Sequence, residues 1–239
     1  MSYKIVFDID KLRERCDEVN PIDAEPTVKA LKDKLNKYGN LYALCAPQIG
    51  IKERVICIKF NNGIIQEYIN PRILKYEDYH LVREKDVCFK DTEFISPRPQ
   101  KILIEYQLSS AKPEQNVLKG AVAEVFDRMV QYLEGICLDT YGLEVIPEFD
   151  KATDEEREEV LKAYLDSFKD KIEVTNKLIS EDPEASKTMR AIKFKEALDK
   201  EEIKLQDLHT EEEKKRLREK IIKDTEEMLE KQKEEEVEE

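Results

Sequence analysis

The 239-residue sequence has no long apolar run, only two histidines and no cysteine pair in C-x-x-C spacing. Without a stretch of about 18 apolar residues it holds no candidate membrane-spanning helix. Its first ten residues include Asp8 and Asp10, where a signal peptide requires an unbroken apolar core. The five cysteines are odd in number and scattered, which favours reduced thiols over a disulfide framework. We therefore expect a soluble, unexported, cytoplasmic protein.

Clustered positive charge is also missing. The chain carries 41 Lys and Arg against 54 Asp and Glu, which gives a net charge of −13 and a pI near 4.9. Proteins that bind nucleic acid neutralise phosphates with grouped basic side chains, and anionic membrane surfaces attract similar groups. The composition therefore predicts neither nucleic acid nor membrane as a partner.

Charge is distributed unevenly along the chain. Residues 151–239 carry 20 basic and 29 acidic side chains, a net charge of −9, against −4 for residues 1–150. At roughly 150 residues per domain, the length fits one buried core plus an appendage. The change in character near Pro147 predicts two parts, residues 1–148 and residues 149–239.

The first part shows an α+β pattern. We expect a short strand at 3–7 and a capped helical turn within 8–19 that places Leu12 and Cys16 on one side. Further expected elements are an amphipathic helix at 26–38 with Val28, Leu31 and Leu35; a hairpin of strands 54–60 and 64–71; strands 80–89 and 101–107, separated by Pro97 and Pro99; and a helix at 117–134 with Val122, Val125, Met129 and Leu133 on one stripe.

The second part reads as an all-α, charged extension of about three helices. A capping box, T-D-E-E at 153–156, opens a helix of about 25 residues with apolar side chains at 161, 165, 168, 172 and 179. Asp182 and Pro183 begin a second helix, with Met189, Ile192, Leu198 and Leu205. A third follows T-E-E-E at 210–213, with Leu217, Ile221, Met228 and Leu229. We expect the last residues to fray.

Several ordered motifs resemble those of the peptide deformylases, metalloenzymes that remove the formyl group from new bacterial N-termini. The stretch L-Y-A-L-C-A-P-Q-I-G at 41–50 resembles the family's G-x-G-L-A-A-P-Q-I-G. Three further landmarks follow the family pattern, namely the helical turn at 8–19, Y-I-N-P at 68–71 and S-P-R-P-Q-K-I-L-I-E-Y at 96–106. The resemblance covers about residues 3–142 and implies the deformylase fold, with β-sheets around a central helix.

The same resemblance locates the family's metal motifs. D-V-C-F-K at 86–90 occupies the place of E-G-C-L-S and keeps Cys88, a metal ligand in the family. Where the family has H-E-x-D-H-L-x-G, this sequence has Arg128 and Tyr132 in place of the two histidines and Met129 in place of the glutamate. The resemblance therefore implies that both imidazole ligands and the proton-transferring group are replaced.

These replacements conflict with hydrolysis. A catalytic zinc or iron site requires three protein ligands and an open position for water. Cys88 alone cannot hold such an ion, a guanidinium at 128 repels it, and Met129 cannot move a proton. We predict no catalytic residue, no metal and no cofactor, with Gln48, Cys88, Arg128, Met129 and Tyr132 as vestigial positions. Gln48, an oxyanion-stabilising residue in the family, is expected to satisfy nearby backbone, and Cys88 to pack as a small hydrophobe.

A charge partner for Arg128 follows from this reasoning. We expect Arg128 and Tyr132 to fill the vacated cavity or face its mouth. Arg128 is hypothesised to pair with Asp86 or with Cys88 as a thiolate, and a side chain directed to bulk solvent would contradict that hypothesis.

The favoured interpretation is an inactive deformylase-like protein that acts as a binding or structural module. Its acidic extension disfavours docking on RNA. The extension instead favours a protein partner or self-association, with a self-contained helical hairpin over the core as the alternative. Such repurposed copies are compatible with a bacteriophage protein, placed in the host cytoplasm or the virion.

Two other functions remain open from the sequence. One is an N-formyl peptide hydrolase with a reorganised site that uses Cys88 with His80, Glu84 or Asp86. The other is capture of a peptide by strand addition in the vestigial groove. The resemblance places four candidate groove residues, which are Leu44, Gln48, Phe89 and Val125.

Overall fold

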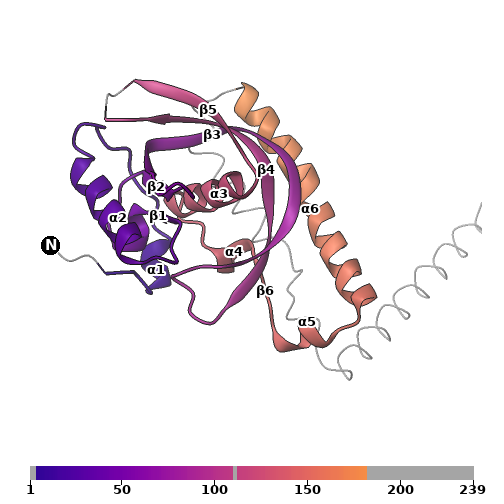
Figure 1. The fold of residues 1–239 in the computed structure, drawn as a ribbon. Helices are drawn as coiled ribbons and strands as arrows, with labels where there is room; N and C mark the ends of the chain where they lie inside the picture. Colours follow the sequence, from indigo (N-terminus) through magenta and orange to yellow (C-terminus); the bar gives the residue numbers. More distant parts are fainter. Residues whose placement is uncertain (1–3, 110–111, 182–239) are drawn as a thin grey trace, which may run out of the picture.

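The computed structural model describes residues 4–109 and 112–181. In this part of the chain, one antiparallel sheet curves around helix α3 (Figure 1). Its strand order is β1-β2-β3-β4-β5, with β6 paired to β4. The strands are β1 (Ala43–Cys45), β2 (Val55–Lys59), β3 (Ile65–Lys85), β4 (Glu93–Gln107), β5 (Pro113–Lys119) and β6 (Leu143–Glu144).

The helices are α1 (Ile9–Leu12), α2 (Glu25–Lys37), the 3-10 helix η1 (Ala46–Ile49), α3 (Ala121–Leu133), α4 (Leu138–Tyr141), α5 (Pro147–Lys151) and α6 (Asp154–Glu181). Helix α3 lies inside the curved sheet, and helix α6 lies along its outside (Figure 1). This arrangement confirms the predicted α+β class. Among the described helices, none is both long and apolar enough to cross a membrane.

The N-terminal region follows the sequence patterns except at its start. Leu12 and Cys16 are buried side by side in the core, and α2 buries Leu31 and Leu35 against the sheet. The described residues 4–7 form no strand, contrary to the prediction. Instead, the Val6 N–H donates a single hydrogen bond of 2.9 Å to the Gln48 carbonyl, which fixes this segment beside η1.

Strand β4 continues through both prolines that were predicted to separate two strands. Pro97 lies opposite Leu81 and Pro99 opposite Tyr79 in the ladder with β3. On its other side, β4 pairs with β6 only at residues 94–95 and with β5 only from Lys101 onward. Proline is tolerated where its missing N–H has no ladder partner. The prediction was wrong because a sequence does not reveal which side of a strand is paired.

Helix α3 is shorter than predicted and is enclosed on more than one face. Residues 113–119 pair with β4 as β5, and Gly120, at a φ of 58°, marks the change from strand to helix. Met129 and Leu133 are buried, as the predicted stripe requires. Phe126 on the same stripe is buried as well, and so are Asp127 and Gln131 on the opposite face. The helix is therefore a central core element rather than a surface amphipathic helix.

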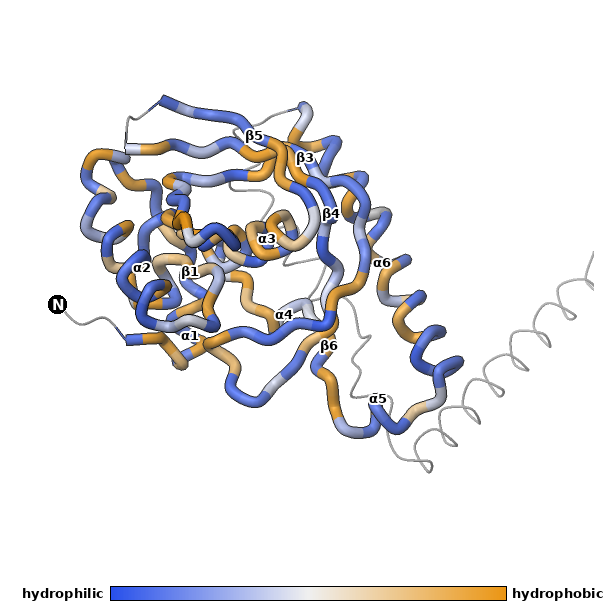
Figure 2. Tube along the Cα trace, in the orientation of Figure 1, coloured by the Kyte–Doolittle hydropathy of each residue, from blue (hydrophilic) through white to orange (hydrophobic). Residues whose placement is uncertain are grey.

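Helix α6, expected within the extension, packs along the outside of β3 (Figure 1). Its tube alternates between hydrophilic and hydrophobic segments (Figure 2), and the apolar positions Tyr164, Phe168 and Ile179 are buried. Asn176 holds the helix in register: its Oδ1 accepts the Tyr76 N–H at 3.0 Å and its Nδ2 donates to the Tyr76 carbonyl at 2.9 Å. The first helix of the extension thus completes the core.

The start of α6 has the predicted capping box. The Thr153 hydroxyl accepts the Glu156 N–H at 3.2 Å, and the Glu156 carboxylate accepts the Thr153 N–H at 3.1 Å. The second and third helices predicted for the extension lie outside the described residues.

Candidate functional site

The vestigial positions converge where η1, the segment after β3 and helix α3 meet. Gln48 comes from η1, Asp86 and Cys88 follow the end of β3, and Tyr132 projects from α3. All four residues are buried, with exposed fractions of 1%, 8%, 4% and 0% respectively. The structure therefore brings together residues that are up to 84 positions apart in the sequence.

The Gln48 side chain is fully engaged by protein groups. Its Oε1 accepts the Cys45 N–H at 3.1 Å, while its Nε2 donates to the two Asp86 oxygens at 3.3 and 3.4 Å and lies 3.7 Å from the Cys88 sulfur. Asp86 in turn accepts the Cys88 N–H at 2.8 Å. These bonds lock the loop that carries Cys88 onto the turn that carries Gln48.

Arg128 reaches from α3 into this site and binds the end of β3. Its Nη1 donates to Glu84 Oε2 at 2.8 Å and to the Lys85 carbonyl at 3.0 Å, and its Nε lies 3.7 Å from Asp86 Oδ2. The side chain is only 15% exposed, so it does not point to bulk solvent. The hypothesised pairing with Asp86 is present, and the closer contact is to Glu84.

Cys88 does not supply a thiolate for Arg128. Burial raises the pKa of the Cys88 thiol well above its usual value, and the adjacent Asp86 raises it further. The sulfur of the neutral thiol lies 3.7 Å from the Gln48 amide nitrogen. Of the two alternative partners in the hypothesis, the structure therefore favours Asp86, because a buried sulfur beside a carboxylate retains its proton.

A second buried arginine, Arg98, lies behind the first and was not assigned a role from the sequence. It is 0% exposed and donates to Glu84 at 2.6 and 2.9 Å, to Asp127 at 2.8 Å and to Gln131 at 2.7 Å. Its guanidinium also lies 5.0 Å from the centroid of the Tyr141 ring. Asp127 and Gln131 stand four apart on α3, a spacing that identifies a shared face but not its partner.

Arg98 pairs with Glu84 and Asp127, and Arg128 pairs with Glu84 and Asp86. With three carboxylates and two guanidinium groups, the cluster carries more negative than positive charge. Burial alone raises the pKa of Glu84, but Arg98, Arg128 and a hydrogen bond from Ser96 outweigh it, and the pKa is lowered. Asp127 behaves in the opposite way. Its complete burial raises the pKa to about 6, because desolvation exceeds the attraction of Arg98.

Tyr132 and Met129 occupy the core side of the site with uncharged groups. The Tyr132 hydroxyl is buried without a hydrogen-bond partner among the described residues, and burial raises its pKa, so the phenol is neutral. Met129 is 1% exposed and packs in the central core. Neither side chain is placed to exchange a proton with solvent.

The residues considered for a reorganised active site have other contacts. His80 Nε2 lies 3.1 Å from Glu124 Oε1, and Glu84 and Asp86 pair with Arg128. Within residues 4–109 and 112–181, histidine, cysteine and carboxylate side chains nowhere gather in threes in a metal-binding arrangement. His209 lies outside the described residues.

Two of the candidate groove residues do not line an open groove. Leu44 is 0% exposed because its side chain packs toward Leu31 and Leu35 of α2, and Gln48 is 1% exposed. Phe89 and Val125 are partly buried, and the Phe89 ring meets Phe94 edge to face at 5.3 Å. The placement of Leu44 in a groove was wrong because alternate residues of β1 face opposite sides of the sheet, and a motif alone does not show which side each residue faces.

Comparison with known proteins gives one consistent family. A family model described as polypeptide deformylase matches residues 4–141. A peptide deformylase of Thermotoga petrophila is 29% identical over 140 residues, covering 57% of this chain and 84% of the relative. One from Dictyoglomus turgidum is 28% identical over 129 residues, covering 53% and 83%. The crystal structure of peptide deformylase from Thermotoga maritima superposes with a TM-score of 0.54 at 26% identity, covering 58% of this chain and 96% of that one.

Proposed function

This chain belongs to the polypeptide deformylase family, and from that premise we propose that it binds or assembles with other proteins and does not hydrolyse formyl peptides. The proposal concerns the chemistry of the site, since the fold is that of the family. Hydrolysis is assigned to the relatives by their names and is not carried over to this chain.

One observation carries the proposal, which is the position of the Arg128 guanidinium. It lies between Glu84 and Asp86, on the α3 position that the family motif gives to a metal-binding histidine. The guanidinium is permanently charged and already pairs with both carboxylates, so it repels a divalent cation at short range. Arg128 thus supplies the positive charge that a metal supplies in an active site.

The remaining donors do not fit a catalytic zinc or iron ion. Cys88 is a single possible ligand, the Gln48 amide is bound to Cys45 and Asp86, and Tyr132 replaces an imidazole with a phenol. Three deprotonated or neutral ligands with one open position are required for metal-assisted hydrolysis. No step of the proposed function therefore involves a metal.

Metal analysis and formate release from a formyl-methionyl peptide test this proposal on the purified full chain. We expect a metal content far below one ion per chain and no formate above the uncatalysed rate. Arg128→His/Met129→Glu/Tyr132→His is the informative comparison, because it returns the missing ligands and base at once. Stoichiometric metal in the unaltered chain, with turnover abolished by Cys88→Ala, would establish the enzymatic alternative instead.

Peptide capture without hydrolysis is the second candidate function. Strand β1 pairs only with β2 in the described sheet, so its other edge has no strand neighbour there, although Gln48 already accepts the Cys45 N–H. Calorimetry with formylated and unformylated peptides of the same sequence checks this role. Measurable affinity for either peptide supports it, whereas undetectable binding of both limits the domain to a scaffold.

The assembly role is proposed for residues 207–239, which contain the third predicted helix of the extension. Its stripe of Leu217, Ile221, Met228 and Leu229 suits a helical protein partner or a second copy. Light scattering of the full chain and of residues 1–206 measures self-association. Equal monomer masses would leave a different protein as the partner.

A further inference from the structure

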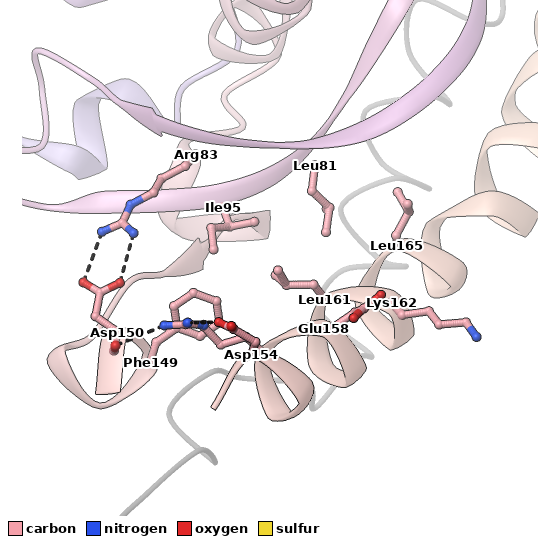
Figure 3. A pocket seen from close by; sticks show the side chains of 11 residues that line it. Leu81, Arg83, Ile95, Phe149, Asp150, Asp154, Glu158, Leu161, Lys162 and Leu165 are labelled. Carbon is pink, nitrogen blue, oxygen red and sulfur yellow. Dashed lines mark hydrogen bonds and ion pairs between the residues drawn. The ribbon is translucent and has the colours of Figure 1, made fainter. Parts of the chain in front are cut away.

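A hollow of about 560 Å³ separates the first half of α6 from the sheet. Leu81 of β3, Ile95 of β4, Phe149 of α5 and Leu161 and Leu165 of α6 line it. Figure 3 shows these side chains converging on the space between the strands and the helix. Charged groups, including Asp150 bound to Arg83, stand at its rim.

The hollow is apolar although α6 already has a buried face. Tyr164 and Phe168 fill the core side of the helix and are 4% and 1% exposed. Leu161 and Leu165 are only partly buried and project beside that face into the hollow. A concave apolar surface with a polar rim is typical of a site that another segment covers.

We propose that residues 184–206 of this chain dock in the hollow, antiparallel to α6. The α6 helix ends at Glu181, and Leu165 and Leu161 precede that end by 16 and 20 residues. At about 1.5 Å per residue, the hollow therefore lies roughly 24–30 Å back along the helix axis. A helix that begins after Pro183 and returns along α6 reaches this level at about residues 200–204.

The sequence of this segment fits the hollow. Phe194, Leu198 and Leu205, at spacings of four and seven, share one helical face. Leu198 and Leu205 bracket the level of Leu161 and Leu165. Two of the three apolar side chains, Leu198 and Leu205, thus come opposite the hollow, where five of the lining residues are apolar.

Charge favours residues 184–206 over the rest of the extension. The charged side chains that line the hollow balance one another, but residues 154–166 of α6 as a whole carry two basic and six acidic side chains, a net charge of −4. Residues 184–206 carry six basic and five acidic side chains, a net charge of +1, whereas residues 207–239 carry a net charge of −6. The less acidic segment is repelled least by this part of α6.

Amide hydrogen exchange of the full chain tests the docking. We expect amides of residues 194–206 to exchange at least tenfold more slowly than unstructured peptide. Leu165→Glu should abolish this protection, because it places a charge in the apolar hollow. Ala163→Glu, which adds the same charge at an exposed position of α6, should retain it.

A variant within the docking segment separates loss of docking from loss of folding. Leu198→Glu should also remove the protection of residues 194–206 while it leaves the exchange of residues 4–181 unchanged. Unprotected amides at 194–206 in the unaltered chain, or equal effects of the 163 and 165 variants, would overturn the proposal. Protection that depends on protein concentration and accompanies a dimer mass would assign the hollow to a second copy. None of these measurements depends on hydrolytic activity.

Discussion

Within the described residues, Arg128 is the only arginine that contacts the Asp86 carboxylate. We predict that Arg128→Met lowers the free energy of unfolding by about 3 kcal/mol, because it leaves the buried Asp86 carboxylate with hydrogen bonds but without a positive charge beside it. Urea denaturation measures the loss. Arg157→Met, which removes an exposed pair with Asp154, should change stability by less than about 1 kcal/mol. Equal losses in the two variants would contradict a buried role for Arg128.

Asp127 should make stability depend on pH in a direction that is unusual for a carboxylate. Its pKa is raised to about 6 in the folded chain, above the ordinary value of 3.8, so the folded state binds the proton more tightly. The contribution of Asp127 to the free energy of unfolding therefore falls as pH rises from about 4 to 6, by up to about 3 kcal/mol.

Denaturation of the original chain and of Asp127→Asn at pH 4.5 and 7 isolates this effect. Between pH 4.5 and pH 7, the original chain should lose stability relative to Asp127→Asn, because the asparagine does not titrate. The lowered pKa of Glu84 acts in the opposite direction but is present in both proteins. Parallel stability curves would show that Asp127 is ionised across the range.

At this scale the sequence identified Cys88, Arg128, Met129 and Tyr132 as one site, because the family motifs align residue by residue. It did not identify Arg98 or Asp127 as members of the same cluster. Charged side chains are buried only when paired, and the pairing of β4 with α3 is a tertiary contact that has no local signal.

Helix α6 is attached to the sheet by a specific side chain as well as by apolar packing. We predict that Asn176→Ala lowers the free energy of unfolding by about 2 kcal/mol, since it removes both bonds to the Tyr76 backbone. Alanine is the better helix former, so intrinsic propensity opposes this loss. Thermal or urea denaturation checks it, with the exposed Lys177→Ala as the control on the same helix.

The elements themselves were predictable where a local signal exists. The capping box of α6, the turn before β3 and the apolar spacing of α2 each depend on neighbouring residues. The continuous β4 and the conversion of residues 117–119 to strand depend on which neighbour each strand pairs with. Local propensity yields to such tertiary pairing.

At the scale of the whole molecule, every cysteine thiol is buried. All five cysteines are buried, and burial raises the pKa of Cys16 and Cys57 to about 12 and the pKa of Cys45 and Cys88 above its usual value. We predict that the native chain reacts with less than one equivalent of a disulfide reagent within minutes at pH 8, and with five after denaturation. Raising the pH to 9 should not expose a fast thiol.

Ala163→Cys provides the control for that measurement, because it adds one exposed thiol on α6 that should react at once. A fast thiol in the original chain that disappears in Cys88→Ala would mean that the site opens to solvent. At this scale the sequence predicted the family fold and left the attachment of α6 open, since a helix with charged and apolar positions packs equally well on its own sheet or on a partner.

The contribution of α6 to the core also bears on how the chain is made. Tyr164, Phe168 and Ile179 are translated after every strand of the described sheet. Until Tyr164 and Phe168 leave the ribosome, the nascent chain exposes the apolar surface around Phe94, Ile95 and Tyr141 that these two side chains later cover. At about 5–20 residues per second, that interval lasts seconds, long enough for a chaperone to bind. The core of the described residues is therefore complete only after Ile179 has left the ribosome.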